Sequence, residues 1–183
     1  MKNKIVLLLC VFLLSQIISA QDKPESAVKI LDDAYKIAAK ENKNVMIVFH
    51  ASWCGWCKKF EASINDPACK DFFDKHFVIK YLDILERRDK KIIENPGAED
   101  IYNKNGGNGG GIPFFLIYDK NKNLLSDSKF KAAADGPNAQ AQNIGCPTSE
   151  EEVVAFIKIL EKEVKISDKE KSAIMERFKK NKS

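Results

Sequence analysis

The sequence predicts an α/β fold in which a central mixed β-sheet is flanked by helices, with an extra helix at the C-terminal end. Three observations lead to this prediction. Short apolar runs alternate with amphipathic helical segments along the first part of the chain. Near residue 120, two further runs flank a polar turn, which predicts a β-hairpin. Helical segments follow the hairpin, and this order is typical of a sandwich built on a mixed sheet.

A helix is predicted over residues 24–42, followed by a buried strand. Asp22 can cap this helix, and Pro24 suits its first turn. The apolar residues recur at helical spacing and form one face: Ile30, Leu31, Ala34, Tyr35, Ile37 and Ala38. The five apolar residues from Val45 to Phe49 then make a short β-rich run, which predicts a buried strand.

Two helical pieces are expected after this strand. The first opens at Cys54 and is expected to end near Ile64. A second piece restarts at the sequence Asn-Asp-Pro, with Asp66 as its cap and Pro67 in its first turn. Three phenylalanines pack this second piece: Phe72, Phe73 and Phe77.

The middle of the chain predicts one strand and one short helix. Residues 77–82 form another apolar run, followed by a charged loop over residues 83–91. Residues 98–103 predict a short helix. The glycine-rich stretch 106–111 opens no helix and has no Lys-Ser or Lys-Thr sequel, so a phosphate-binding loop is not expected. Two interpretations remain open, a flexible connector or a mobile rim beside a site that adapts to varied substrates.

The last third of the chain predicts a hairpin and two helices. Residues 114–118 form a buried strand, and residues 124–130 are expected to pair with it across a polar turn. After a loop over residues 131–147, a helix is predicted from Thr148 with Glu151 as its capping-box partner. A second capping box begins the final helix. Its two members are Ser167 and Glu170, and the apolar face that follows consists of Ile174, Met175 and Phe178.

The predicted strand at Val45 leads directly into a Cys-x-x-Cys pair, Cys54 and Cys57. In a helix, residues three apart lie on one face, so the two sulfurs can come within bonding distance. The first cysteine sits where backbone N–H groups lack partners within the helix, and these groups favour a thiolate. We therefore expect Cys54 to be an exposed nucleophile and Cys57 a more buried resolving thiol.

Two motifs in this order resemble the thioredoxin superfamily. The first follows the apolar strand, and it is Trp53-Cys54-Gly55-Trp56-Cys57-Lys58. The second is Gly111-Ile112-Pro113, followed by an apolar strand, and it is similar to the cis-proline loop of the family. The resemblance covers about residues 25–165. The sequence Gly-Trp between the cysteines is similar to exported members of the superfamily rather than to cytoplasmic thioredoxins, which usually carry Gly-Pro there.

The resemblance implies dithiol–disulfide exchange, with Cys54 as nucleophile and Cys57 as resolving thiol. It also implies a cis bond between Ile112 and Pro113, with the proline facing the two sulfurs. Trp53 would then shape the rim. A cis proline leaves the backbone groups of the preceding residue free to pair with a substrate strand. The substrate-binding residues predicted in this way are Trp53, Trp56, Ile112 and Pro113.

The sequence departs from the family pattern in the strand before the cysteines. Many thioredoxins carry a buried acid six positions before the first cysteine, and Val48 stands there in this chain. Glu61, one helical turn after Cys57, can either assist proton transfer through water or be an ordinary solvated helix residue. Lys58 can either raise the thiolate content or be a surface lysine.

Composition and the N-terminus set the compartment and the partners that we expect. The chain has 183 residues, 44% of them hydrophobic and 31% charged, which suits one soluble domain. Residues 1–20 predict a signal peptide, with an uncleaved anchor as the alternative. Without Lys2 and Lys4 the balance is 28 basic against 26 acidic residues, or +2, too mild to favour nucleic acid. We expect a periplasmic or secreted monomer with a domain over 21–165 and a helical extension over 166–183.

Two further cysteines remain outside the pair, and each has two interpretations. Cys146 precedes the last core helix, so it is either a third thiol that reaches Cys54 or an idle buried thiol. Cys69 lies twelve residues beyond Cys57, and we do not expect it to bridge to Cys146. His50 and His76 are expected to be structural. No second Cys-x-x-Cys or histidine pair stands at ligand spacing, so no metal is predicted.

The function that these features predict is an exported thiol–disulfide oxidoreductase that acts on proteins. Its partners would be proteins with cysteines or disulfides, together with a membrane or soluble thiol electron donor or an oxidant. The cysteines supply the redox equivalents, so no dissociable cofactor is needed. The alternative is a non-catalytic peptide-binding or chaperone-like module in which the Cys54–Cys57 disulfide is a permanent staple.

Overall fold

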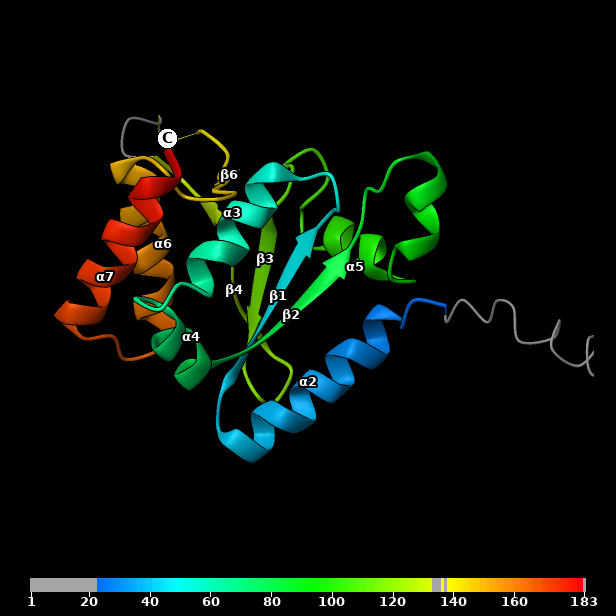
Figure 1. Ribbon diagram of the computed structural model, residues 1–183, viewed down its shortest axis with the longest axis horizontal. Coiled ribbons are helices and arrows are strands. Elements are labelled where there is room, and N and C mark those ends of the chain that lie inside the picture. Colours follow the sequence, from blue (N-terminus) through cyan, green and yellow to red (C-terminus); the bar gives the residue numbers. More distant parts are fainter. Residues whose placement is uncertain (1–22, 133–135, 137, 183) are drawn as a thin grey trace, which may run out of the picture.

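Four strands form one mixed sheet in the computed structural model, which describes residues 23–132, 136 and 138–182 (Figure 1). The strands are β1 (Asn44–His50), β2 (Phe77–Asp83), β3 (Phe114–Tyr118) and β4 (Leu124–Asp127), in the order β2-β1-β3-β4. Strand β1 runs parallel to β2 and antiparallel to β3. The predicted α/β fold with a mixed sheet is therefore confirmed. The predicted leader, residues 1–20, lies outside the described residues.

Alternation along the strands divides the core into two layers. Val45, Ile47 and Phe49 are fully buried on one face of β1, while Met46 and Val48 are buried on the other. Successive side chains of a strand point to opposite faces, and both faces of this central strand are covered. This explains why β1 reads as a continuous apolar run rather than as an alternating one.

Helices α2 (Ala27–Glu41) and α5 (Ala98–Lys104) cover the first face. Ser26 caps α2, because its side chain accepts a hydrogen bond from the backbone N–H of Lys29 at 3.3 Å. The predicted start at residue 24 is therefore wrong by about three residues, and Asp22, the predicted cap, lies outside the described residues. Serine is a strong N-cap residue, and Ser26 stands one position before the first buried alanine of the helix.

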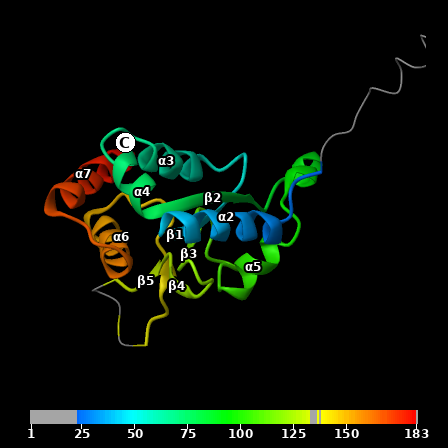
Figure 2. The same cartoon turned by 90° about the horizontal axis from the view of Figure 1, so that it is seen from below.

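The other face is covered by α3 (Gly55–Ile64), α4 (Lys70–His76), α6 (Glu150–Glu163) and α7 (Asp168–Lys179). Figure 2 shows α3 and α4 on one side of the sheet and α5 on the other. Phe60 is the centre of this layer, because its ring contacts the rings of Phe115, Phe156 and Phe178, with centroids 5.8–5.9 Å apart. Aromatic pairs at such separations add to the stability gained from burial.

Two further helix boundaries, those of α4 and α6, differ from the predicted ones. Asp66 does not cap α4; its side chain accepts from the N–H of Ala68, and its carbonyl accepts from Cys69 and Lys70, so it closes a turn before the helix begins. Ser149 rather than Thr148 caps α6, with Glu152 as the partner in the capping box. Each shift moves the start of a helix to where a side chain or a turn satisfies its free N–H groups.

Two segments have a secondary structure that the sequence did not predict. The charged loop after β2 includes a 3₁₀ helix, η2 (Arg88–Ile93). The predicted strand over residues 124–130 breaks at Ser128, after which β5 (Lys129–Phe130) pairs with β6 (Gln142–Asn143) in a separate ribbon. Ser128 is buried and its hydroxyl binds the N–H of Phe115 and the side chain of Asn143, which redirects the chain there.

The final helix, α7, begins at the predicted capping box. The hydroxyl of Ser167 and the carboxylate of Glu170 exchange hydrogen bonds with each other's backbone N–H groups. Ile174 and Phe178 are fully buried, and α7 packs on α3 and α6. After α7, the chain ends in η3 (Lys180–Lys182), where Asn181 donates to the hydroxyl of Ser63 on α3 at 2.8 Å. The C-terminal helix is therefore part of the core layer around Phe60.

We predict that Phe178→Ala lowers the free energy of unfolding by about 3–5 kcal/mol, because it removes a buried ring that contacts Phe60 and Phe156. Urea unfolding followed by circular dichroism measures this change. Glu176→Ala, at an exposed position of the same helix, is the matched control and should change stability by less than about 0.5 kcal/mol. Equal effects of the two substitutions would show that α7 does not contribute to the core.

Candidate active site

The candidate site lies where β1 ends and α3 begins. The chain leaves the strand through Ala51 and Ser52, and Cys54 is the N-cap residue of α3 in an extended conformation. The sulfurs of Cys54 and Cys57 are joined in a disulfide, with Cα atoms 5.3 Å apart. The local sequence produces this geometry because small residues release the chain from the strand and the next turn is helical, which places the two cysteines on one face.

The sulfur of Cys54 caps the helix. It accepts a hydrogen bond from the backbone N–H of Cys57 at 3.1 Å, in the position that a serine or aspartate oxygen usually occupies. The first N–H groups of a helix have no partners within it, and they favour negative charge. After reduction, the same N–H would stabilise a thiolate on Cys54.

The proline loop lies against this sulfur. The peptide bond between Ile112 and Pro113 is cis, as expected from the resemblance. The carbonyl oxygen of Ile112 lies 3.6 Å from the sulfur of Cys54, and the Ile112 side chain packs on Ala51 and both cysteines. The structure therefore brings Cys54, Cys57, Ile112 and Pro113 together from two distant parts of the chain.

Cys54 is more buried than the sequence led us to expect. In the disulfide form the residue is 4% exposed, and Cys57 is 3% exposed. The prediction of an exposed nucleophile beside a buried resolving thiol is thus wrong for this oxidised state. The cause is the close approach of Ile112, which covers the disulfide from the side of the proline loop.

Two tryptophans flank the disulfide on the surface. Trp53 is 43% exposed and Trp56 is 50% exposed, so both leave apolar surface open to solvent. The indole N–H of Trp53 donates to the carbonyl of Leu85 at 2.9 Å, and the guanidinium of Arg87 lies 4.4 Å from the ring centroid. Trp53 is therefore fixed in place by the segment after β2, whereas Trp56 lies under the ammonium of Lys59 at 4.8 Å.

Glu86 is a buried carboxylate that the sequence reasoning missed. It is 3% exposed, and its two oxygens accept from the backbone N–H of Ser52 and from the Ser52 hydroxyl, the latter at 2.9 Å. The backbone N–H of Glu86 in turn donates to the carboxylate of Glu94 at 2.7 Å. Glu86 thus anchors the loop two residues before Cys54. The apolar pair Ile84-Leu85 inside a charged loop is the signal that could have indicated a buried segment.

The family model of Thioredoxin-like proteins matches residues 26–120, more than half of the chain. The chain belongs to this family. The matched region includes both cysteines of the disulfide, the cis proline and all of β1, β2 and β3.

Curated relatives of this thioredoxin-like chain share short stretches with it. Protein disulfide-isomerase of Hordeum vulgare is 31% identical over 82 residues, which is 45% of this chain and 15% of that protein. Protein disulfide isomerase-like 1-1 of Arabidopsis thaliana is 28% identical over 124 residues, 63% of this chain and 25% of that protein. The matched stretches thus cover a quarter or less of the length of these relatives.

Among solved structures, the chain is similar to a disulphide isomerase from Xylella fastidiosa Temecula1. The TM-score is 0.49 and the sequence identity 15%, and the alignment covers 91% of this chain and 99% of that one. At this identity the likeness adds nothing to the fold described above.

The glycine-rich segment before Pro113 is held to the rest of the thioredoxin-like domain. The side-chain amide of Asn143 lies within 3.0–3.1 Å of the carbonyls of Gly110, Gly111 and Pro113. Gly107 lies against the ring of Tyr102, where an added Cβ would come within 2.3 Å of ring atoms. These contacts anchor the proline loop, and sequence reasoning did not identify Asn143 because its partners lie about thirty residues away.

Cys69 and Cys146 are free thiols that lie in the core rather than at the site. Burial raises the pKa of Cys69 to about 11 and that of Cys146 to about 12. The sulfur of Cys146 accepts from the side chain of Asn181 at 3.4 Å. A raised pKa keeps both thiols protonated near neutral pH, and only a thiolate attacks a disulfide. The structure therefore favours the idle buried thiol over the third active thiol for Cys146.

The remaining candidate residues have structural partners or apolar surroundings. His50 contacts the carboxylate of Asp83 at 3.3 Å, and burial together with the charges of Glu86 and Glu94 raises the pKa of Asp83. His76 is the last residue of α4, and burial lowers its pKa.

Within the described residues, no group of three or more histidine, cysteine or acidic side chains is placed to hold a metal ion. In the same part of the chain, no helix is both long and apolar enough to cross a membrane.

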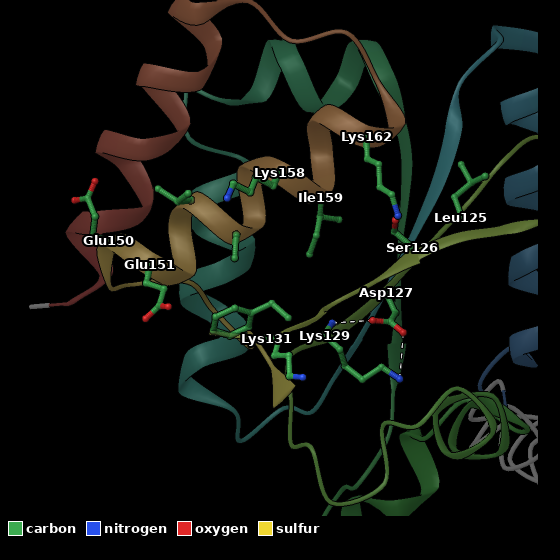
Figure 3. Close-up of a pocket in the computed structure, with 13 residues that line it drawn as sticks. Leu125, Ser126, Asp127, Lys129, Lys131, Glu150, Glu151, Lys158, Ile159 and Lys162 are labelled. Atoms are coloured by element: carbon green, nitrogen blue, oxygen red, sulfur yellow. Dashed lines mark hydrogen bonds and ion pairs between the residues drawn. The ribbon is translucent and has the colours of Figure 1, made fainter. Parts of the chain in front are cut away.

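A cavity of about 1020 Å³ lies away from the disulfide, between α6 and the strands β4 and β5 (Figure 3). Leu125 and Ile159 contribute apolar surface to it, and Lys158 and Lys162 project from α6 at its edge. None of the predicted site residues lines this cavity. The Cys54–Cys57 disulfide and this cavity are therefore separate features of the molecule.

We predict that Glu86→Ala lowers the free energy of unfolding by about 1–3 kcal/mol, because it leaves the N–H of Ser52 without its acceptor in a buried loop. Glu86→Gln keeps an oxygen acceptor and should cost less. Glu99→Ala, an exposed acid of α5, is the control that should leave stability nearly unchanged. Chemical unfolding of the oxidised proteins compares the three. If Glu86→Ala matched the control, the carboxylate would not be what holds the loop.

Proposed function

We propose that this chain is an exported thiol–disulfide oxidoreductase that exchanges disulfides with protein substrates. The observation that carries the proposal is the Cys54–Cys57 disulfide at the start of α3, with the N–H of Cys57 directed at the sulfur of Cys54. A disulfide with this cap can be reduced to a stabilised thiolate. Membership of the Thioredoxin-like family and the short matches to protein disulfide-isomerases support the same chemistry.

In the reducing direction, the Cys54 thiolate attacks one sulfur of a substrate disulfide. An S–S bond forms between Cys54 and the substrate, while the substrate's own S–S bond breaks and its other sulfur leaves as a thiolate. Cys57 then loses its proton and attacks Cys54, which closes the Cys54–Cys57 disulfide and releases the second substrate sulfur. The substrate gains two electrons, and the leaving thiolates take protons from solvent. The oxidising direction reverses these steps.

The residues around the disulfide would bind the substrate and cover the sulfurs, and they take no part in the bond changes. The carbonyl of Ile112 lies against the sulfur of Cys54, and the cis bond to Pro113 leaves the Ile112 backbone available to pair with a substrate strand. Trp53 and Trp56 offer half-exposed apolar surface beside them. Val48 is buried and apolar, so it supplies no acid to accept the proton of Cys57.

Export and partners complete the proposal. Residues 1–20 are the proposed signal peptide, and disulfide chemistry suits an exported protein in the periplasm or outside the cell. The substrates are proteins with cysteines or disulfides. A membrane or soluble thiol donor, or an oxidant, returns the pair to its starting state, and the protein works as a monomer.

We predict that Cys54→Ser abolishes reduction of insulin disulfides by dithiothreitol-charged protein, because it removes the attacking thiolate. Cys57→Ser should instead accumulate mixed disulfides with substrate, because the resolving thiol is gone. Turbidity of insulin and non-reducing gels measure the two effects. Cys69→Ser is the control and should keep wild-type activity, since this thiol is buried in the core.

The rival function, a non-catalytic peptide-binding module, makes the opposite prediction. If the disulfide is a permanent staple, neither Cys54→Ser nor Cys57→Ser changes insulin reduction, and a double serine variant still binds peptide. That pair of results would overturn the proposed enzyme.

A further inference from the structure

A short basic segment projects beside the candidate site. Residues 87–93 follow β2, include η2 and are all exposed. Four of the seven are cations, Arg87, Arg88, Lys90 and Lys91, while Asp89 is the single acid among them. Ile92 is 65% exposed and Ile93 39% exposed, so apolar surface adjoins the cations.

Two of these cations contact the residues that lead into Cys54. The guanidinium of Arg87 lies 4.4 Å from the ring centroid of Trp53. The ammonium of Lys90 donates to the hydroxyl of Ser52 at 3.3 Å. Ser52 and Trp53 directly precede Cys54 in the chain. Arg87 and Lys90 therefore hold positive charge against the two residues that precede the proposed nucleophile.

The two acids that flank this segment, Glu86 and Glu94, are engaged by hydrogen bonds or ion pairs. Glu86 is 3% exposed and accepts hydrogen bonds from Ser52. Glu94 accepts from the ammonium of Lys91 at 3.1 Å and from the backbone of Glu86. The exposed face of this segment consequently combines the cations Arg87, Arg88 and Lys90 and the single acid Asp89 with the half-exposed ring of Trp53.

We propose that residues 87–93 are a recognition surface for substrate segments that carry acidic residues beside their reactive cysteine. The inference rests on the proposed function, because a substrate must approach Cys54 for exchange to occur. Its flanking residues then lie against Arg87 and Lys90. Opposite charges accelerate encounter and orient it, and like charges retard it. The apolar residues of the same surface contact the substrate without selecting charge.

The test compares the rates at which reduced protein reacts with three synthetic peptides. Each peptide contains one disulfide and has the same length, with glutamate, glutamine or lysine flanking the cysteines. For wild-type protein at low salt, we expect the glutamate peptide to react about 3- to 10-fold faster than the lysine peptide. The ratio should shrink in 1 M salt, because screening weakens interactions between exposed charges.

Variants of matched charge assign the preference to this surface. R87Q/K90Q should bring the rate ratio close to one, whatever it does to the absolute rates. K158Q/K162Q removes two positive charges from the edge of the distant cavity (Figure 3) and should keep the wild-type ratio. Asp89→Asn removes the exposed acid of the segment and should increase the rate ratio. This variant keeps the contacts of Arg87 with Trp53 and of Lys90 with Ser52, so it tests the charge of the surface alone.

The outcomes separate this inference from the proposed function. A wild-type ratio of one, a ratio unchanged in R87Q/K90Q, or an equal loss in K158Q/K162Q would overturn the recognition surface while leaving exchange intact. Failure of wild-type protein to react with any of the three peptides would instead contradict the proposed function. A ratio that falls in R87Q/K90Q and rises in Asp89→Asn would support the assignment.

Discussion

The hydrogen bond from the N–H of Cys57 to the sulfur of Cys54 is the interaction on which the site depends. It makes the sulfur of Cys54 the cap of a helix, so the beginning of α3 and the position of the proposed nucleophile are fixed by the same contact. Glu86 holds the loop before it through Ser52, and Ile112 covers it from the proline loop. Loss of any of these supports would move the sulfur relative to the N–H group that stabilises its thiolate.

The scaffold keeps this junction in place because β1 is buried on both faces. One face packs against α2 and α5, and the other against the aromatic layer around Phe60. Phe60 belongs to α3, so the helix that carries Cys57 is anchored in the same core as Phe156 and Phe178. The final helix, which the sequence suggested as an extension, therefore helps to hold the helix that carries Cys57.

Local signals account for what the sequence predicted. The runs at Val45 and Phe114 identified strands because a central strand is apolar throughout, and the capping box at Ser167 identified the start of α7. Glu86, Asn143 and Asn181 were missed because each acts through partners 30 to 120 residues away. The burial of Cys54 was missed for the same reason, since Ile112 covers it from across the fold.

The reduction potential of the Cys54–Cys57 pair tests the central claim most directly. Equilibration of the protein in glutathione buffers of graded ratio, with acid quenching and thiol alkylation, measures the oxidised fraction. If the pair exchanges disulfides with substrates, it should titrate reversibly as a two-electron couple between about −120 and −270 mV, the range of known dithiol oxidoreductases. A pair that stays fully oxidised below about −300 mV would be a structural disulfide and would contradict the account.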